Sequence, residues 1–231
     1  MLRLVTWFCL AAALGALLVA CGEDDASRPQ GGSAQEKGTP APAPTSEAGC
    51  ETVRAPEPKA DGELSKPKLR LDRTRTYLAT VKTSCGDFEI TLDAKRSPRT
   101  GGSFVSLARD RFFDGGIFHR IVPDFVIQGG DPTGTGMGGP GYSITEAPPD
   151  DLSYTKGVVA MAKTEAEAPG TSGSQFYVVT GDDAGLPPDY ALLGQVTKGI
   201  EVVELIGAVP AGADGRPVDP VIIRSVTVKE G

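Results

Sequence analysis

The amino-acid sequence predicts a mainly β fold, a closed antiparallel eight-stranded barrel capped by two α-helices and preceded by a disordered linker. From about residue 76 onward, short runs of alternating apolar and polar residues recur, separated by turns rich in glycine and proline. Only two segments of this region have helical periodicity. Many short strands with few helices are typical of a barrel, because closure of the sheet leaves no free edge.

The first two strands form a hairpin. Apolar and polar residues alternate over Tyr77–Val81 and again over Phe88–Leu92, and Cys85-Gly86-Asp87 between them is a turn sequence. Ser97-Pro98 then predicts the start of a helix, because serine is a common N-cap and proline suits the first helical position. Apolar residues between Phe104 and Ala108 fall on one face of this helix.

The remaining strands are short and follow in chain order. A second helix is predicted among them at about Gly199–Ile206, where apolar residues again share one side. The strands are expected at about Ile117–Val122, Phe125–Gln128, Val158–Met161, Gln175–Thr180 and Tyr190–Val196, with Val221–Val228 as the closing strand.

The first 20 residues have the pattern of an export signal. Arg3 gives a positive start, an uncharged and mostly apolar run extends from Leu4 to Ala20, and Leu18-Val19-Ala20-Cys21-Gly22 ends it. This ending resembles the bacterial lipobox, which implies cleavage before Cys21 and a lipid on its thiol. The alternatives are an uncleaved membrane anchor, for which the run is at the short limit, and a soluble secreted protein.

We therefore divide the chain into a lipoprotein signal peptide (1–20), a lipid-anchored flexible linker rich in proline, glycine and alanine (21–75) and a globular domain (76–231). Residues 22–67 hold seven prolines but only two large apolar residues, Val53 and Leu64. Such a stretch buries too little apolar surface to offset the entropy of ordering it. We expect the protein on the extracytoplasmic side of a cell membrane, facing the periplasm or the cell surface.

Two of the four cysteines remain for the folded part of the mature chain, because Cys9 lies in the signal peptide and Cys21 carries the lipid. An exported chain meets an oxidising compartment, so Cys50 and Cys85 are expected to pair in a disulfide between the end of the linker and the first hairpin. Two free thiols are the alternative. Neither cysteine belongs to a CxxC motif, which argues against a redox enzyme.

Composition and motifs exclude several functions. The net charge is -7 with both signs interspersed, whereas nucleic-acid binders usually need a basic face. His119 is the one histidine, which excludes a multi-histidine zinc site, and we expect it to be packed and hydrogen-bonded. Gly134–Gly139 contains a GxGxxG match, but Pro140-Gly141 follows instead of a helix, so we interpret it as a flexible loop and expect no nucleotide, cofactor or metal.

Several blocks of sequence point to one family. Phe118–Asp131 reads FHRIVPDFVIQGGD, Gly157–Ala162 reads GVVAMA, and Gly173–Tyr177 reads GSQFY. Leu186 and Tyr190–Gly194 (YALLG) follow them. In order and spacing these blocks resemble the cyclophilins over about residues 76–229. The resemblance implies a barrel of this kind and peptidyl-prolyl cis/trans isomerase activity without a cofactor or metal.

The resemblance also implies which residues act. Rotation about an Xaa-Pro bond breaks no covalent bond, so a catalyst needs only to favour the twisted state, in which the proline nitrogen accepts a hydrogen bond. Arg120 would supply that bond, since arginine stays charged. The residues expected to bind the proline ring and the peptide around it are Phe125, Val126, Gln128, Met161, Ala162, Gln175, Tyr177, Leu186 and Tyr190.

Two positions depart from the family pattern. Gly185 stands where tryptophan is frequent and Tyr190 where histidine is frequent, which removes part of the pocket wall and leaves cyclosporin sensitivity open. The expected function is isomerisation of Xaa-Pro bonds in exported polypeptides, which assists their folding, by a monomer tethered to the membrane through Cys21. The alternative is a tethered chaperone module that binds proline-containing peptides in the same groove with little turnover. In a third interpretation the barrel is only a spacer.

Overall fold

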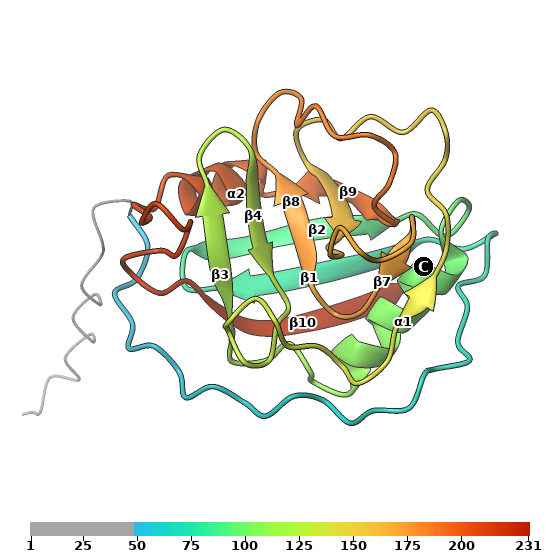
Figure 1. Ribbon diagram of the computed structural model, residues 1–231, viewed down its shortest axis with the longest axis horizontal. Coiled ribbons are helices and arrows are strands. Elements are labelled where there is room, and N and C mark those ends of the chain that lie inside the picture. The colour runs from blue at the N-terminus through green and yellow to red at the C-terminus, as the bar shows by residue number, and fades with distance from the viewer. Residues whose placement is uncertain (1–48) are drawn as a thin grey trace, which may run out of the picture. The chain divides into compact units, whose positions relative to one another are not determined.

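Eight antiparallel strands close into a barrel in the order β1-β10-β3-β4-β8-β6-β9-β2, which confirms the predicted fold (Figure 1). The computed structural model describes residues 49–231, all within one structural unit. Two further strands, β5 (Ile144–Thr145) and β7 (Thr171–Ser172), pair with each other. The barrel strands are β1 (Tyr77–Thr83), β2 (Gly86–Leu92), β3 (Gly116–Val122), β4 (Val126–Gly129), β6 (Val158–Met161), β8 (Phe176–Val179), β9 (Leu192–Lys198) and β10 (Ile222–Glu230).

The two helices are α1 (Pro98–Arg109) and α2 (Ile200–Gly207). Helix α1 packs against β9 and β10, helix α2 packs against β2 and β4, and Figure 1 shows them at opposite ends of the barrel. Ser97 is the N-cap of α1 as predicted, but its hydroxyl donates to the Asp93 carbonyl at 3.0 Å. The Glu146 carboxylate instead accepts the N–H groups of Arg99 and Thr100 in the first turn, at 3.2 and 2.7 Å.

Alternation along the strands sorts the apolar side chains into two clusters. On β8, Phe176 and Val178 belong to the core inside the barrel, whereas Tyr177 and Val179 face outward. The interior is rich in aromatic rings, and the centroids of Phe104 and Phe113 lie 4.9 Å apart. We call the buried outward-facing set, with the half-buried residues packed on it, the outer cluster. Its buried members are Val126, Leu152, Tyr154, Val158, Ala160, Tyr177, Val179 and Leu192.

A bulge in β3 turns Arg120 away from the interior. The register with β4 pairs Phe118 with Gly129 and Arg120 with Gln128, so β3 has one extra residue, His119, at this point. Phe118 and Ile121 consequently both belong to the interior core, while Arg120 between them is half-buried. The bulge therefore places a charged side chain on the outer face without removing a core residue.

His119 is buried beneath a glycine-rich loop. The residue is 6% exposed, and a Cβ built at Gly136 would lie 3.7 Å from its Nε2 atom. The prediction of a hydrogen-bonded imidazole is wrong, because neither ring nitrogen has a partner among the described residues. Burial lowers the pKa of His119, an effect that nearby Asp131 opposes.

Residues 49–75, which we call the strap, run along the outside of the barrel; Figure 1 shows them in blue to teal along its lower edge. The strap begins beside the first hairpin, where Cys50 and Cys85 form a disulfide and the Glu51 N–H donates to the Ser84 carbonyl at 2.9 Å. It ends on helix α1, where Leu71 is 5% exposed. The Cβ position of Gly101 lies against the Leu71 side chain.

The predicted flexible linker is therefore wrong for residues 49–75. The strap buries little apolar surface, as its composition indicated, but it is held by backbone hydrogen bonds to the barrel and by a covalent bond. Its middle is fixed at Lys59, whose N–H donates to the Pro132 carbonyl and whose ammonium donates to the Phe112 carbonyl. Composition does not report such bonds. The predicted signal peptide, the lipidated Cys21 and linker residues 21–48 lie outside the described residues.

The observed strand ends differ from the predicted ones by one or two residues at several places. Phe125, Gln175 and Tyr190 each precede a strand rather than beginning one. Strands β5 and β7 escaped prediction because two residues are too few to show a period. Within residues 49–231, no helix combines the length and the apolar character that crossing a membrane requires.

Replacing both Cys50 and Cys85 with serine should lower the free energy of unfolding by about 3 kcal/mol. The bond joins residues 35 apart in the sequence, so it restricts the unfolded chain more than the folded one. Urea denaturation followed by circular dichroism measures the change. Wild-type protein kept in reductant should match the double variant, and an unchanged urea midpoint would contradict the prediction.

Stability should also fall on acidification because of His119. Its pKa in the folded protein lies below its ordinary value of 6.5, so below that pH the unfolded chain binds more protons than the folded one. This contribution is fully present above the unfolded pKa. It declines by up to about 1.4 kcal/mol per pH unit below it, until the folded pKa is reached. In His119→Gln, urea denaturation between about pH 7 and about pH 5 should show a smaller slope; an identical slope in both proteins would refute the assignment.

Candidate active site

The outer cluster collects most of the predicted apolar site residues. Val126 and Tyr177 are 2% and 4% exposed, and Phe125, Leu186 and Tyr190 are half-buried against them. The strands β4 and β8 supply the buried members, and the loop before β9 supplies Leu186 and Tyr190. The cluster therefore presents a partly exposed apolar surface that packs on buried side chains of the barrel strands.

Three tyrosine rings stabilise this surface. The centroids of Tyr177 and Tyr190 lie 5.6 Å apart in an edge-to-face arrangement, and Tyr154 lies 6.0 Å from Tyr190. The Tyr154 hydroxyl donates to the Tyr190 carbonyl at 2.6 Å and accepts from the Tyr190 N–H at 2.9 Å. Burial raises the pKa of Tyr154 to about 12, so the hydroxyl stays protonated at neutral pH. One side chain thus fixes the backbone of Tyr190.

Arg120 lies at the edge of the outer cluster. Its Cζ atom is 5.8 Å from the centroid of the Phe125 ring, within the range of a cation–π contact. Its stem packs on the turn at Gly215, where an added Cβ would come within 3.0 Å of Arg120 Cγ. None of the ion pairs among residues 49–231 includes Arg120. The guanidinium charge is therefore not neutralised by a described carboxylate.

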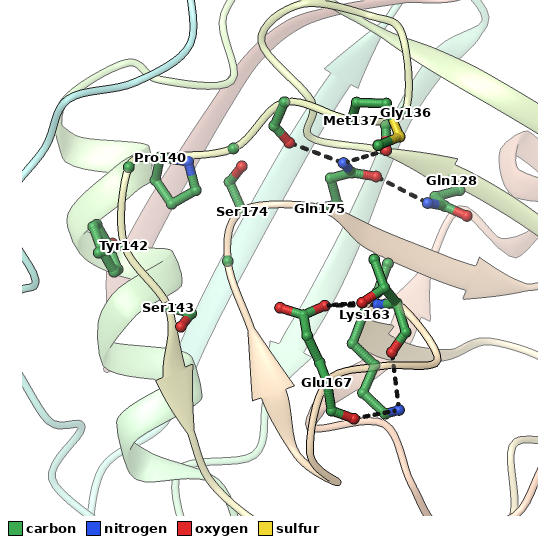
Figure 2. Close-up of a pocket in the computed structure, with 16 residues that line it drawn as sticks. Gln128, Gly136, Met137, Pro140, Tyr142, Ser143, Lys163, Glu167, Ser174 and Gln175 are labelled. Atoms are coloured by element: carbon green, nitrogen blue, oxygen red, sulfur yellow. Dashed lines mark hydrogen bonds between the residues drawn. The ribbon is translucent and has the colours of Figure 1, made fainter.

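A chain of side-chain amides leads away from Arg120. Its Nη1 approaches Gln128 Oε1 at 3.5 Å, and Gln128 Nε2 donates to Gln175 Oε1 at 3.0 Å. Gln175 Nε2 donates to the carbonyls of Gly136 and Gly138, both at 2.9 Å. Figure 2 shows the two glutamines end to end, with the glycine-rich loop beyond them. The predicted flexible loop at Gly134–Gly139 is thus a fixed hydrogen-bond acceptor.

The two glutamines differ in how many N–H donors they have left for a ligand. A primary amide has two N–H donors, and both donors of Gln175 are engaged by the glycine carbonyls. Gln128 uses one donor for Gln175 and keeps the other. Gln128 is consequently the residue that can still donate to a bound peptide, while Gln175 holds it in place.

A cavity of about 450 Å³ adjoins these amides. Gln128, Ala162 and Gln175 line it, and Ala162 also packs on the outer cluster, so it lies between the two. The Lys163 side chain, 4% exposed, forms part of the wall and pairs with Asp189 Oδ2 at 2.7 Å. Its ammonium also donates to the carbonyls of Thr164 and Glu167, which engages all three N–H groups. Lys163 therefore braces the wall and has no donor left for a ligand.

Met161 is the predicted site residue that the structure places elsewhere. It is 1% exposed, belongs to the interior core and pairs with Phe176 across the sheet. Because side chains alternate along β6, Ala160 faces outward and Met161 faces inward. The prediction that Met161 lines the groove is therefore wrong.

Sequence reasoning missed the supporting residues. Tyr154 and Lys163 lie in loops, where no period distinguishes a positioning side chain from a solvated one. The residue at the family's frequent tryptophan position, Gly185, has φ of 62°, and an added Cβ would meet no atom within 4 Å. That side of the outer cluster is open.

The comparisons with known proteins agree with this geometry. Residues 78–228 match the family model described as "Cyclophilin type peptidyl-prolyl cis-trans isomerase/CLD". The chain is 37% identical to "Peptidyl-prolyl cis-trans isomerase A" of Mycobacterium tuberculosis, over 66% of this chain and 92% of that protein. It is 38% identical to "Peptidyl-prolyl cis-trans isomerase B" of Streptomyces anulatus, over 65% and 95% respectively.

Solved structures give the same result. The crystal structure of a cyclophilin-type peptidyl-prolyl cis-trans isomerase of Cryptosporidium parvum superposes with a TM-score of 0.63 and 29% identity, covering 67% of this chain and 98% of that one. A second structure of that protein, in the presence of the dipeptide Ala-Pro, gives a TM-score of 0.62 at the same identity, covering 66% and 98%. Barrel, site geometry and relatives together show that this chain belongs to the cyclophilin-type peptidyl-prolyl cis-trans isomerase family.

Proposed function

We propose that this protein accelerates rotation about Xaa-Pro bonds in exported polypeptides, with Arg120 as its catalytic residue, and so assists their folding. The observation that carries the proposal is a guanidinium with no ion pair among residues 49–231, held beside a partly exposed apolar surface. The proline ring would pack on the outer cluster, next to Phe125, Tyr177 and Leu186. The structural neighbour that was solved in the presence of Ala-Pro supports a proline-containing ligand.

The chemistry requires selective stabilisation of a twisted amide. Resonance sets a barrier of about 18–20 kcal/mol to rotation, and twisting returns the lone pair to the proline nitrogen. A charged donor aimed at that nitrogen stabilises the twisted state more than either planar state, because the planar nitrogen is a poor acceptor. Each 1.36 kcal/mol of this difference corresponds to a factor of about ten in rate.

The rest of the peptide needs only to be held. Gln128, with one free N–H and a carbonyl beside Arg120, suits the backbone of the substrate. Gln175 acts through Gln128. Residues on the amino side of the proline would run past Ala162, which borders both the outer cluster and the cavity. This arrangement needs no metal or cofactor.

Arg120→Ala should reduce kcat/KM for an Ala-Pro peptide by about a hundredfold, the usual effect of removing one transition-state donor. Arg120→Lys should recover only part of the activity, because a flexible ammonium does not reproduce the fixed guanidinium plane. Exchange spectroscopy by NMR measures the rate. Arg73→Ala is the matched control, since Arg73 is exposed and forms no ion pair with other described residues.

Two results would contradict this assignment in different ways. An Arg120→Ala variant as active as the wild type would remove Arg120 from the mechanism. A wild-type protein that binds the peptide but leaves its exchange rate unchanged would favour the tethered peptide-binding or chaperone module.

The proposal extends to location. The apolar run and Leu18-Val19-Ala20-Cys21 support cleavage before Cys21 and anchoring of a monomer to the outer side of a membrane through a lipid on that residue. The disulfide between Cys50 and Cys85 supports an oxidising compartment, because such bonds rarely persist in the cytosol.

Mass spectrometry of the mature N-terminus tests the anchor. We expect the chain to begin at Cys21 with a diacylglyceryl group, and Cys21→Ser to release the protein from the membrane fraction. An N-terminus that is not Cys21, or a Cys21 without lipid, would rule out the lipoprotein form.

A further inference from the structure

The strap contacts the loop that carries the amide chain. The Gly62 N–H donates to the Gly139 carbonyl and the Leu64 N–H to the Pro140 carbonyl, both at 2.9 Å. In return the Gly139 N–H donates to the Asp61 carboxylate at 3.0 Å. We call Asp61–Leu64 the clamp. It lies outside the residues that match the family model, which begin at 78.

The clamp and the loop meet backbone against backbone. A Cβ at Gly62 would lie 2.8 Å from the Pro140 backbone, and a Cβ at Gly141 would lie 2.4 Å from the Gly62 carbonyl oxygen. Real Cβ atoms do not approach so closely, so glycine is required on both sides. The contact therefore depends on close backbone packing and hydrogen bonds, and not on burial of apolar side chains.

The loop has a second attachment, at Asp131. The Asp131 carboxylate accepts the N–H groups of Thr133 and Gly136. Burial acts to raise the pKa of Asp131, but the hydrogen bonds outweigh it and the pKa is lowered. Between Asp131 and Gly141 the loop contains several glycines, whose backbones have more freedom to lose than those of other residues. Asp131 holds the start of the loop, and the clamp holds its end.

This loop supplies the acceptors on which the site depends. The carbonyls of Gly136 and Gly138 engage both N–H groups of Gln175, which orients Gln128 beside Arg120. Gly139, the residue that the clamp binds on both its N–H and its carbonyl, directly follows Gly138. A shift of Gly139 would move the Gly138 carbonyl, which accepts a hydrogen bond from Gln175 Nε2 at 2.9 Å.

We infer that the strap is a positioning element of the isomerase site. Asp61 and Gly62 fix the end of the glycine-rich loop, the loop fixes Gln175, and Gln175 fixes Gln128 for the substrate. The strap is itself secured before the clamp by the disulfide at Cys50, and after it by the buried side chain of Leu71, which packs against helix α1. The inference rests on the proposed function, since it assigns the strap to the same site.

The variants Asp61→Ala and Gly62→Val, made in the whole chain, test whether the strap positions the site. Each should lower kcat/KM for the Ala-Pro peptide by about three- to tenfold, mainly through kcat. Each should also shift the side-chain amide signals of Gln175 and Gln128 in ¹H–¹⁵N NMR spectra. Asp61→Asn keeps an oxygen acceptor for the Gly139 N–H and should restore both readouts. Glu57→Ala is the matched control, because Glu57 lies in the strap outside the clamp, is exposed, and its side chain forms no hydrogen bond or ion pair with a described residue.

All rates are compared well below the melting temperature of each variant. If Asp61→Ala and Gly62→Val melt earlier but keep wild-type kcat/KM and unshifted glutamine signals, the strap only stabilises the barrel and the inference fails. A wild-type protein without isomerase activity would refute the proposed function instead. The glutamine signals would then still decide whether the clamp orients Gln175.

Discussion

One extra residue in β3 decides which side of the barrel receives Arg120. Without the bulge at His119, Phe118 and Ile121 could not both face the interior, because residues three apart lie on opposite faces of a regular strand. The bulge keeps both core residues and directs Arg120 outward. It leaves a buried imidazole without a hydrogen-bond partner among the described residues.

The polar side chain that contacts the Arg120 guanidinium is a neutral amide, Gln128, and not a carboxylate. A carboxylate beside Arg120 would fix its orientation but would also reduce the positive potential available to a substrate. Gln128 gives direction without opposite charge, and Gln175 transmits the position of the glycine-rich loop. The tyrosines act similarly on the apolar side, where Tyr154 fixes the backbone of Tyr190. The described side chains that contact the guanidinium, Gln128 and Phe125, are thus both uncharged.

The barrel and much of the site could be predicted because period and residue type carry that information locally. The alternation around β3, β4 and β8 gave the strands, and the blocks around Arg120 and Gln175 gave the family. Met161 was misplaced because a block match does not say which face of β6 a residue occupies. The strap could not be predicted, since its order depends on backbone bonds to residues 132–140, far away in the sequence. Tyr154 and Lys163 were missed because they lie in loops, and their partners Tyr190 and Asp189 are distant in the sequence.

The grouping of Tyr154, Tyr177 and Tyr190 has an optical consequence. The sequence contains five tyrosines and a single tryptophan, Trp7, which lies outside the described residues. Three of the five tyrosines therefore gather where a proline ring would bind, with ring centroids no more than 6.3 Å apart. In a form of the protein that lacks residues 1–20, no indole would mask their emission. Intrinsic phenol fluorescence would then report ligand occupancy directly, without any attached dye.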